Sequence, residues 1–260
     1  MNRLTAAFSS EARKVLRSKI LWISILAFLM IPLVGGFFMF ILKDPALARS
    51  SGLIGAKAQL AGTADWPSYF QFLSQAVAVG GLVLFGFVSS WIFGREYSDR
   101  TIKDLLALPI PRILIVLAKF ITVFLWCLVL SLLVLVLGLW VGKIVVLPGW
   151  SGLLAVQGCK TFLLCAILTM VLCTPVAFFA CWGRGYLTPL GFVVLSLIFA
   201  QIVAATGYGQ FFPWAVPALL SRVAGSAIAL PGNIGYFLVV LTGIAGLIGT
   251  SLWWRYADHL

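Results

Sequence analysis

The stretch "GREYSDRTIKDLLALPIPR" (Gly94–Arg112) breaks the pattern of the rest of the chain. It carries seven formal charges in nineteen residues, whereas only 10% of the 260 residues in the whole chain are charged. Apolar runs of more than twenty residues precede and follow it. A short charged segment between two such runs indicates a loop in water that joins two membrane-spanning helices.

The composition agrees with a membrane protein. Hydrophobic residues make up 62% of the chain and the mean hydropathy is +1.12, whereas a soluble domain is about 45–50% apolar and about 25% charged. Six apolar runs have the roughly 20 residues that a helix needs to cross the hydrocarbon layer. They are Ile20–Leu42, Tyr69–Phe93, Ile113–Val141, Phe162–Trp182, Tyr186–Thr206 and Ile234–Trp254. We therefore predict an all-α membrane protein with six transmembrane helices, forming one domain over residues 1–260.

The distribution of Lys and Arg predicts the orientation. Six spans put both termini on one side, and twelve of the eighteen basic residues fall on that side. These are Arg3, Arg13, Lys14, Arg17, Lys19, Arg95, Arg100, Lys103, Arg112, Lys119, Arg184 and Arg255. Because cytoplasmic loops carry the excess of positive charge, both termini and the opening stretch are expected in the cytoplasm. The net charge of +11 fits membrane lipids as partners better than a nucleic acid, since the charges lie beside the spans.

Two further segments flank the spans. Residues 1–19 are expected to form an interfacial helix at the cytoplasmic surface, with Leu4, Phe8, Ala12 and Val15 on its apolar side. Residues 207–233 are too apolar for a plain loop and too short and Pro-interrupted for a span. We expect an external re-entrant or surface-lying helix there, with Pro213 near its start.

Within the opening stretch, Ser98 is expected to cap a short helix that begins at Asp99. The apolar residues of this helix recur at helical spacing and form one stripe: Ile102, Leu105, Leu106 and Pro109. The stripe suits docking in a groove of a cytoplasmic protein. Packing on the inner leaflet or on the protein's own N-terminal helix would produce the same pattern, so the periodicity leaves these alternatives open.

The longer stretch "FGREYSDRTIKDLLALPIPRILIVLAKF" (Phe93–Phe120) resembles the signature of type-2 permeases of ATP-binding-cassette (ABC) transporters, of the bacitracin-resistance and lantibiotic-immunity type. The residues that carry the resemblance are Glu96, Tyr97, Thr101, Lys103, Leu105, Leu106, Pro109, Arg112 and Lys119. The motif covers about thirty residues, and the six-span layout extends the resemblance over the whole chain.

The resemblance implies a transporter driven by separate ATPase subunits. Two such subunits would bind ATP and Mg, and a second permease subunit, identical or homologous, would complete the assembly. Residues 1–19 would be the elbow helix and residues 94–112 the cytoplasmic coupling segment. The expected ATPase contacts are Glu96, Tyr97, Asp99, Arg100, Thr101, Ile102, Lys103, Leu105, Leu106 and Leu108, with Pro109, Arg112 and Lys119 as structural motif residues. On this basis Leu105→Asp or Glu96→Ala is expected to uncouple ATP hydrolysis from transport without unfolding the chain.

Polar residues inside the predicted spans are few. Lys119 lies about two turns from the inner face, where its side chain is expected to snorkel to water in a structural role. Gln71, Gln75 and Gln201 are candidates for a substrate path. Interhelical hydrogen bonding is the commoner use of such glutamines, and both interpretations stay open for Gln71 and Gln75.

The expected function is transport of an amphiphilic substrate, such as a peptide antibiotic or a lipid-like compound. The alternative is a complex that senses or removes an antibiotic from the outer leaflet without translocating it. An intramembrane enzyme would need paired catalytic groups or a metal cluster, and the sequence offers no acid pair, Ser/His pair or metal-ligating cluster. No cofactor or metal is therefore expected in this chain. A channel is disfavoured because it would not explain the coupling-type helix.

Overall fold

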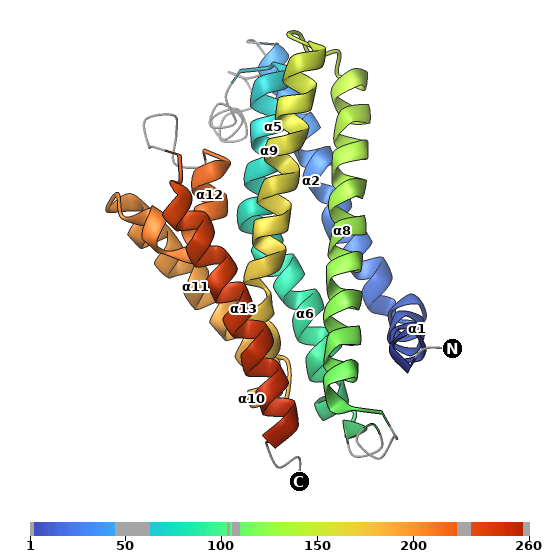
Figure 1. The fold of residues 1–260 in the computed structure, drawn as a ribbon. Coiled ribbons are helices and arrows are strands. Elements are labelled where there is room, and N and C mark those ends of the chain that lie inside the picture. Colours follow the sequence, from blue (N-terminus) through green and yellow to red (C-terminus); the bar gives the residue numbers. More distant parts are fainter. Residues whose placement is uncertain (1–2, 45–62, 103–104, 106–109, 223–229, 257–260) are drawn as a thin grey trace.

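A computed structural model describes residues 3–44, 63–102, 105, 110–222 and 230–256. All regular structure in these ranges is helical (Figure 1). Among the described residues, six helical segments are long and apolar enough to cross a membrane, which confirms the predicted number of spans. Both termini lie towards the same end of the bundle, which we call the α1 end after the helix found there (Figure 1).

Five of the six spans extend beyond the boundaries predicted from hydropathy, and the fifth is one residue shorter than predicted at each end. The first is α2 (Lys19–Lys43), the third α8 (Arg112–Ile144), the fifth α11 (Leu187–Ala205) and the sixth α13 (Asn233–Tyr256). The second consists of α5 (Trp66–Gln75), the π-helical turn η1 (Ala76–Gly80) and α6 (Gly81–Ser98). The fourth consists of α9 (Gly152–Leu172) and α10 (Thr174–Trp182). The fourth span begins well before the predicted Phe162 because the Ser151 side chain accepts a hydrogen bond from the Leu154 amide and caps the helix (3.2 Å).

The fourth span is interrupted at Cys173, just before Pro175. Because proline has no amide hydrogen, it removes a helical hydrogen bond at this point. Side chains satisfy nearby carbonyls: Ser89 of α6 donates to Cys173 O (3.3 Å), and Thr174 donates to Gly243 O of α13 (2.8 Å). The interruption thus joins three spans by polar contacts, and α10 packs extensively on α13 beyond it.

At the α1 end, α1 (Arg3–Leu16) precedes the first span and lies beside the lower part of α8 (Figure 1). A separate N-terminal helix was predicted for residues 1–19, and the structure places it over Arg3–Leu16. α8 also packs along α2, so this long helix contacts both N-terminal elements.

The opposite end carries η2 (Gly209–Phe211), η3 (Pro213–Ala215) and α12 (Val216–Leu220) and is called the α12 end below. A re-entrant or surface-lying helix was predicted within residues 207–233; in the described part of this range, residues 207–222 and 230–233, the structure has three short helical turns before Ser221 in place of one continuous helix. Proline at 213 and 217 accounts for the division, since each proline favours a new helix start. Val216 is fully buried, and this segment packs against α9, α11 and α13.

Candidate functional site

The site is built from α1, the end of α6 and the lower part of α8, and it surrounds the base of the 94–112 segment. On α1 the residues buried against the bundle are Ala7, Glu11 and Val15, spaced four apart. Of the residues predicted for the apolar side of this helix, Val15 is buried, whereas Leu4, Phe8 and Ala12 are only half-buried. Glu11, with an exposed fraction of 4%, therefore points a carboxylate into the protein interior.

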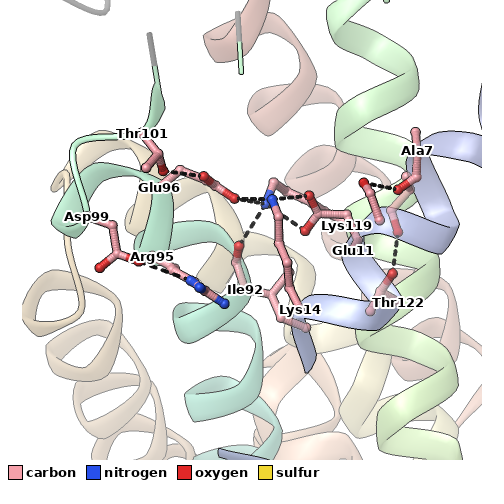
Figure 2. A network of polar contacts seen from close by, with 12 residues as sticks. Ala7, Glu11, Lys14, Ile92, Arg95, Glu96, Asp99, Thr101, Lys119 and Thr122 are labelled. Carbon is pink, nitrogen blue, oxygen red and sulfur yellow. Dashed lines mark hydrogen bonds and ion pairs between the residues drawn. The ribbon is translucent and has the colours of Figure 1, made fainter. Parts of the chain in front are cut away.

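Lys119 of α8 has no exposed surface. Its ammonium donates to Glu11 Oε2 (3.0 Å), to Glu96 Oε1 (3.1 Å) and to the Ile92 carbonyl oxygen (3.1 Å), which uses all three N–H groups (Figure 2). The sequence predicted that this side chain would snorkel to water. The structure corrects this, because partners inside the protein replace water completely.

Glu96 of α6 lies at the centre of the cluster and has an exposed fraction of 4%. Its Oε1 accepts from Lys14 (2.7 Å) as well as from Lys119, and its Oε2 accepts from the Thr101 hydroxyl (2.6 Å) (Figure 2). Lys14 also reaches Glu11 Oε1 (2.8 Å). We call Glu11, Lys14, Glu96 and Lys119 the charge cluster.

The charge cluster contains two cations and two carboxylates, so it is neutral as a unit. This balance matters because an unpaired buried charge costs several kcal/mol, whereas a fully paired one need not be destabilising. Partial burial acts to lower the pKa of Lys14, but the carboxylates of Glu11 and Glu96 outweigh it and raise that pKa above the ordinary 10.5. Lys14 is accordingly charged at neutral pH and stabilises both carboxylates.

The 94–112 segment leaves the bundle through a turn that Glu96 itself closes. The Thr101 amide donates to the Glu96 carbonyl oxygen (3.0 Å) and the Arg100 amide to that of Tyr97 (3.2 Å), while Arg100 has a φ of 57°. This is the Schellman arrangement of a helix end, with arginine where glycine is usual. Ser98 is therefore the last residue of α6, and it does not cap a new helix at Asp99 as predicted.

Beyond Thr101, the Leu105 amide donates to the Thr101 carbonyl oxygen (3.1 Å). Ile102 is buried and Leu105 is packed against the core, so this part of the predicted stripe faces the protein itself. The remaining predicted contacts Lys103, Leu106 and Leu108, together with Pro109, lie outside the described residues.

Other predicted contact residues divide between surface and interior. Asp99, Arg100 and Thr101 are exposed, and Asp99 is paired with Arg95 (3.0 Å). Tyr97 is half-buried and packs against the core. The prediction that Glu96→Ala would leave folding intact does not suit this geometry, because the change would leave two buried or half-buried lysines with one carboxylate.

Arg112 begins α8 and connects it to the last span. Its Nη1 donates to the carbonyl oxygens of Trp254 (3.2 Å) and Arg255 (3.4 Å) at the end of α13. A cation is favourable there because the last carbonyls of a helix are unpaired and carry partial negative charge. The structural role expected of Arg112 therefore has a geometric basis.

The three glutamines lie away from the charge cluster. Gln71 and Gln75 both donate to the Arg222 carbonyl oxygen (3.4 and 3.2 Å), which ties α5 to the segment that contains α12. Gln75 and Gln201 also line one apolar groove of about 600 Å³ between α2, the second span and α11. Gln75 thus both donates a hydrogen bond to a neighbouring segment and lines a groove, so the two predicted roles do not exclude each other.

Sequence reasoning missed Glu11 and Lys14 as site residues. One signal was available: the chain has only two glutamates, Glu11 and Glu96, and both lie in the charge cluster. Glu11 is also the only acidic residue before Asp44. A single carboxylate in a basic, membrane-associated segment is expected to pair with a basic side chain inside the protein.

Comparisons with known proteins agree with this architecture. Residues 7–201 match the family described as "ABC-2 family transporter protein". A similar relative is the bacitracin transport permease protein BCRB of Bacillus licheniformis, with 27% identity over 179 residues, which are 68% of this chain and 85% of the relative. No solved structure matches the chain.

The six candidate spans and the polar site at the root of the loop between the second and third spans define a multi-pass membrane protein. The chain belongs to the ABC-2 family of transporter proteins and is a multi-pass permease of the cell membrane.

Proposed function

We propose that this permease moves an amphiphilic substrate, a peptide antibiotic or a lipid-like compound, across the membrane. A separate pair of ATPase subunits, which bind ATP and Mg, would supply the energy, and a second permease subunit, identical or homologous, would complete the pathway. The substrate class is supported by the name of the similar bacitracin transport permease. The proposed orientation places the α1 end in the cytoplasm, since most basic residues belong to it.

The charge cluster is the observation that carries the proposed mechanism. Glu96 accepts hydrogen bonds from α1, from α8 and from Thr101 at the start of the exposed turn. A displacement of that turn by a bound ATPase would therefore move α1 and α8 together. An ATPase can bias the membrane part only through contacts that differ between its nucleotide states, and the turn would provide those contacts.

Coupling through a buried polar network has a physical advantage over coupling through apolar packing alone. Each member of the charge cluster has partners at defined distances, so a small shift of one group breaks several charge-assisted hydrogen bonds. We propose that the cluster therefore transmits displacement as a unit, while the exposed residues Asp99 and Arg100 face the ATPase.

Arg100→Glu tests the proposal without entering the charge cluster, because Arg100 is exposed. The chain would be produced with an ABC ATPase from the same gene cluster in a bacitracin-sensitive bacterium. We expect the wild-type pair to raise the inhibitory bacitracin concentration. Reversing one interfacial charge should weaken co-purification of the ATPase by about tenfold and remove most of the resistance.

Lys143→Glu is the matched control, since it makes the same charge change on an exposed residue at the other end of α8. It should keep both ATPase binding and resistance. Equal behaviour of the two variants would contradict docking at the 94–112 segment. Absence of any resistance with an intact complex would contradict the antibiotic as substrate.

A second candidate function is removal of an antibiotic from the outer leaflet without translocation. It is favoured by a pocket of about 380 Å³ at the α12 end, whose lining combines polar residues such as Gln71, Gln157 and Arg222 with apolar ones such as Phe70 and Leu154. Vesicles that contain the complex and labelled bacitracin in the membrane would separate the two functions. ATP-dependent accumulation on the opposite side indicates transport, and release on the original side indicates extraction.

A further inference from the structure

A second polar feature lies beside the charge cluster and opens at the protein surface. It is a pocket of about 520 Å³ between α1, the start of α2, the end of α6 and Tyr186. Its charged lining residues are the cations Arg13, Lys14, Arg17, Lys19 and Arg95 and the carboxylate Asp99. We call it the basic pocket. Its lining carries a clear excess of positive charge.

Two of the five cations form ion pairs with carboxylates of the protein. Lys14 is paired with Glu11 and Glu96, and Arg95 with Asp99 (3.0 Å). Within the part of the chain that the structure describes, no ion pair joins the other three cations, Arg13, Arg17 and Lys19, to a carboxylate. Three positive charges at one concave surface create a positive potential that attracts an anionic ligand.

The basic pocket lies where the chain enters the membrane. Lys19 begins the first span, and the next side chains along α2 include Trp22 and Ile23, with exposed fractions of 67% and 53%. Such apolar exposure on a spanning helix faces lipid. Trp91 also lines the pocket, with the Arg95 guanidinium 5.2 Å from its ring centroid. Tryptophan is typical of the headgroup level of a membrane.

We propose that the basic pocket binds the phosphate headgroup of an anionic phospholipid, whose acyl chains lie along the exposed side of α2 near Trp22 and Ile23. Arg13 and Arg17 would contact the phosphate, since guanidinium groups suit bidentate binding of phosphate oxygens. A free phosphate would use the same cations but would leave the adjoining apolar surface unexplained. A bound headgroup would connect α1 to the end of α6 next to the charge cluster.

The test measures phosphatidylglycerol binding to the full-length chain in detergent by titration and by native mass spectrometry. Arg13→Gln/Arg17→Gln removes two unpaired cations. Because each cation near an anionic lipid contributes about 1 kcal/mol, or roughly fivefold, the double variant should bind about 30-fold more weakly. Lys143→Gln/Lys160→Gln removes two exposed cations from the opposite end of the protein and should leave binding unchanged.

Three further arms identify the ligand. Phosphatidylcholine should bind much more weakly than phosphatidylglycerol, and millimolar inorganic phosphate should not compete; competition by phosphate would overturn the lipid assignment. Displacement of the lipid when the ATPase is added would show that the pocket is a protein interface. Equal losses in both double variants, or no loss in either, would overturn the site itself.

A folding control keeps the result interpretable. Arg13→Lys/Arg17→Lys keeps both charges and should retain most of the phosphatidylglycerol affinity. If the glutamine variant aggregates, weaker lipid binding by a soluble Arg17→Gln single variant decides the question. Unchanged binding by that variant would count against the proposal. None of these outcomes depends on the transported substrate, so failure here leaves the proposed transport function untouched.

Discussion

Lys119 shows how one residue can hold three elements together. Its ammonium has no exposed surface and contacts carboxylates from α1 and α6 as well as a backbone carbonyl. Burying a charge is tolerable only when its partners compensate for the lost water. Here Glu11 and Glu96 provide that compensation, and each of them needs Lys119 in return.

Lys119→Met is expected to destabilise the protein by about 3–5 kcal/mol, because it leaves a net negative charge in the interior. Adding Glu96→Gln restores neutrality, so the double variant should lose less stability than Lys119→Met alone. Thermal unfolding in detergent, followed by size-exclusion chromatography of the heated samples, provides the comparison. The single variant Glu96→Gln is measured in the same way. If the double variant loses at least as much stability as Lys119→Met and Glu96→Gln lose together, the charge cluster is not a coupled unit.

Asp65 supplies a pH-dependent contribution at the α12 end. It caps α5 by accepting from the Ser68 amide (2.8 Å) and from the Thr63 hydroxyl. Burial acts to raise its pKa, but these hydrogen bonds outweigh it and hold the pKa below the ordinary 3.8. The stability from this cap is thus fully present above pH 3.8 and is lost as the pH falls through the folded-state pKa.

Two substitutions separate capping from titration at Asp65. Asp65→Ala should lose about 1 kcal/mol at pH 7, whereas Asp65→Asn should keep most of the cap and lose less stability than wild type on acidification. Melting temperatures at pH 7 and across pH 5 to 3 give the comparison. Identical acid dependence in wild type and Asp65→Asn would exclude this carboxyl as a contributor.

At the scale of elements, α13 relies on close approach to the interruption between α9 and α10. The sequence shows Gly243, Gly246 and Gly249 at every third position. A Cβ at Gly246 would lie 2.5 Å from the Pro175 backbone nitrogen, whereas one at Gly249 would meet only ordinary contact at 3.5 Å from the Phe178 ring. Only part of the glycine pattern is therefore needed for packing.

Gly246→Ala is expected to destabilise the bundle by about 1–3 kcal/mol, since backbone atoms of Thr174 and Pro175 cannot move aside cheaply. Gly249→Ala is the matched control and should change stability by less than about 0.5 kcal/mol. Both would be compared by heating the purified proteins in the same detergent. A tolerated Gly246→Ala would mean that α13 and α10 separate more easily than their contact indicates.

At the scale of the whole molecule, both termini and α1 lie towards one end of the bundle (Figure 1), and α1 carries Glu11 and Lys14 of the charge cluster. The excess of basic residues there predicts that this end faces the cytoplasm. A green fluorescent protein fused after Leu260 should then fluoresce, and alkaline phosphatase inserted after Trp150 should be active. The opposite pair of results would invert the orientation and remove the ATPase from reach of the 94–112 segment.

The six spans could be predicted from sequence because the membrane imposes a local condition. Every backbone group must bond within its own helix, so a run of about 20 apolar residues suffices to locate a span. The charged Gly94–Arg112 stretch could be recognised in the same way, because it separates two such apolar runs. Both features can be predicted without knowing which helices pack against each other.

The partners of Glu96 were decided only by the tertiary structure. Lys14 lies 82 residues before it in the chain, and Glu11 and Lys119, which share the charge cluster, are 108 residues apart. The position of Lys119 near the end of an apolar run predicted that its side chain would snorkel to water, and the family resemblance implied an ATPase contact for Glu96. Packing of α1 on α8 brought the charges together in the interior, where low polarity makes each depend on the others.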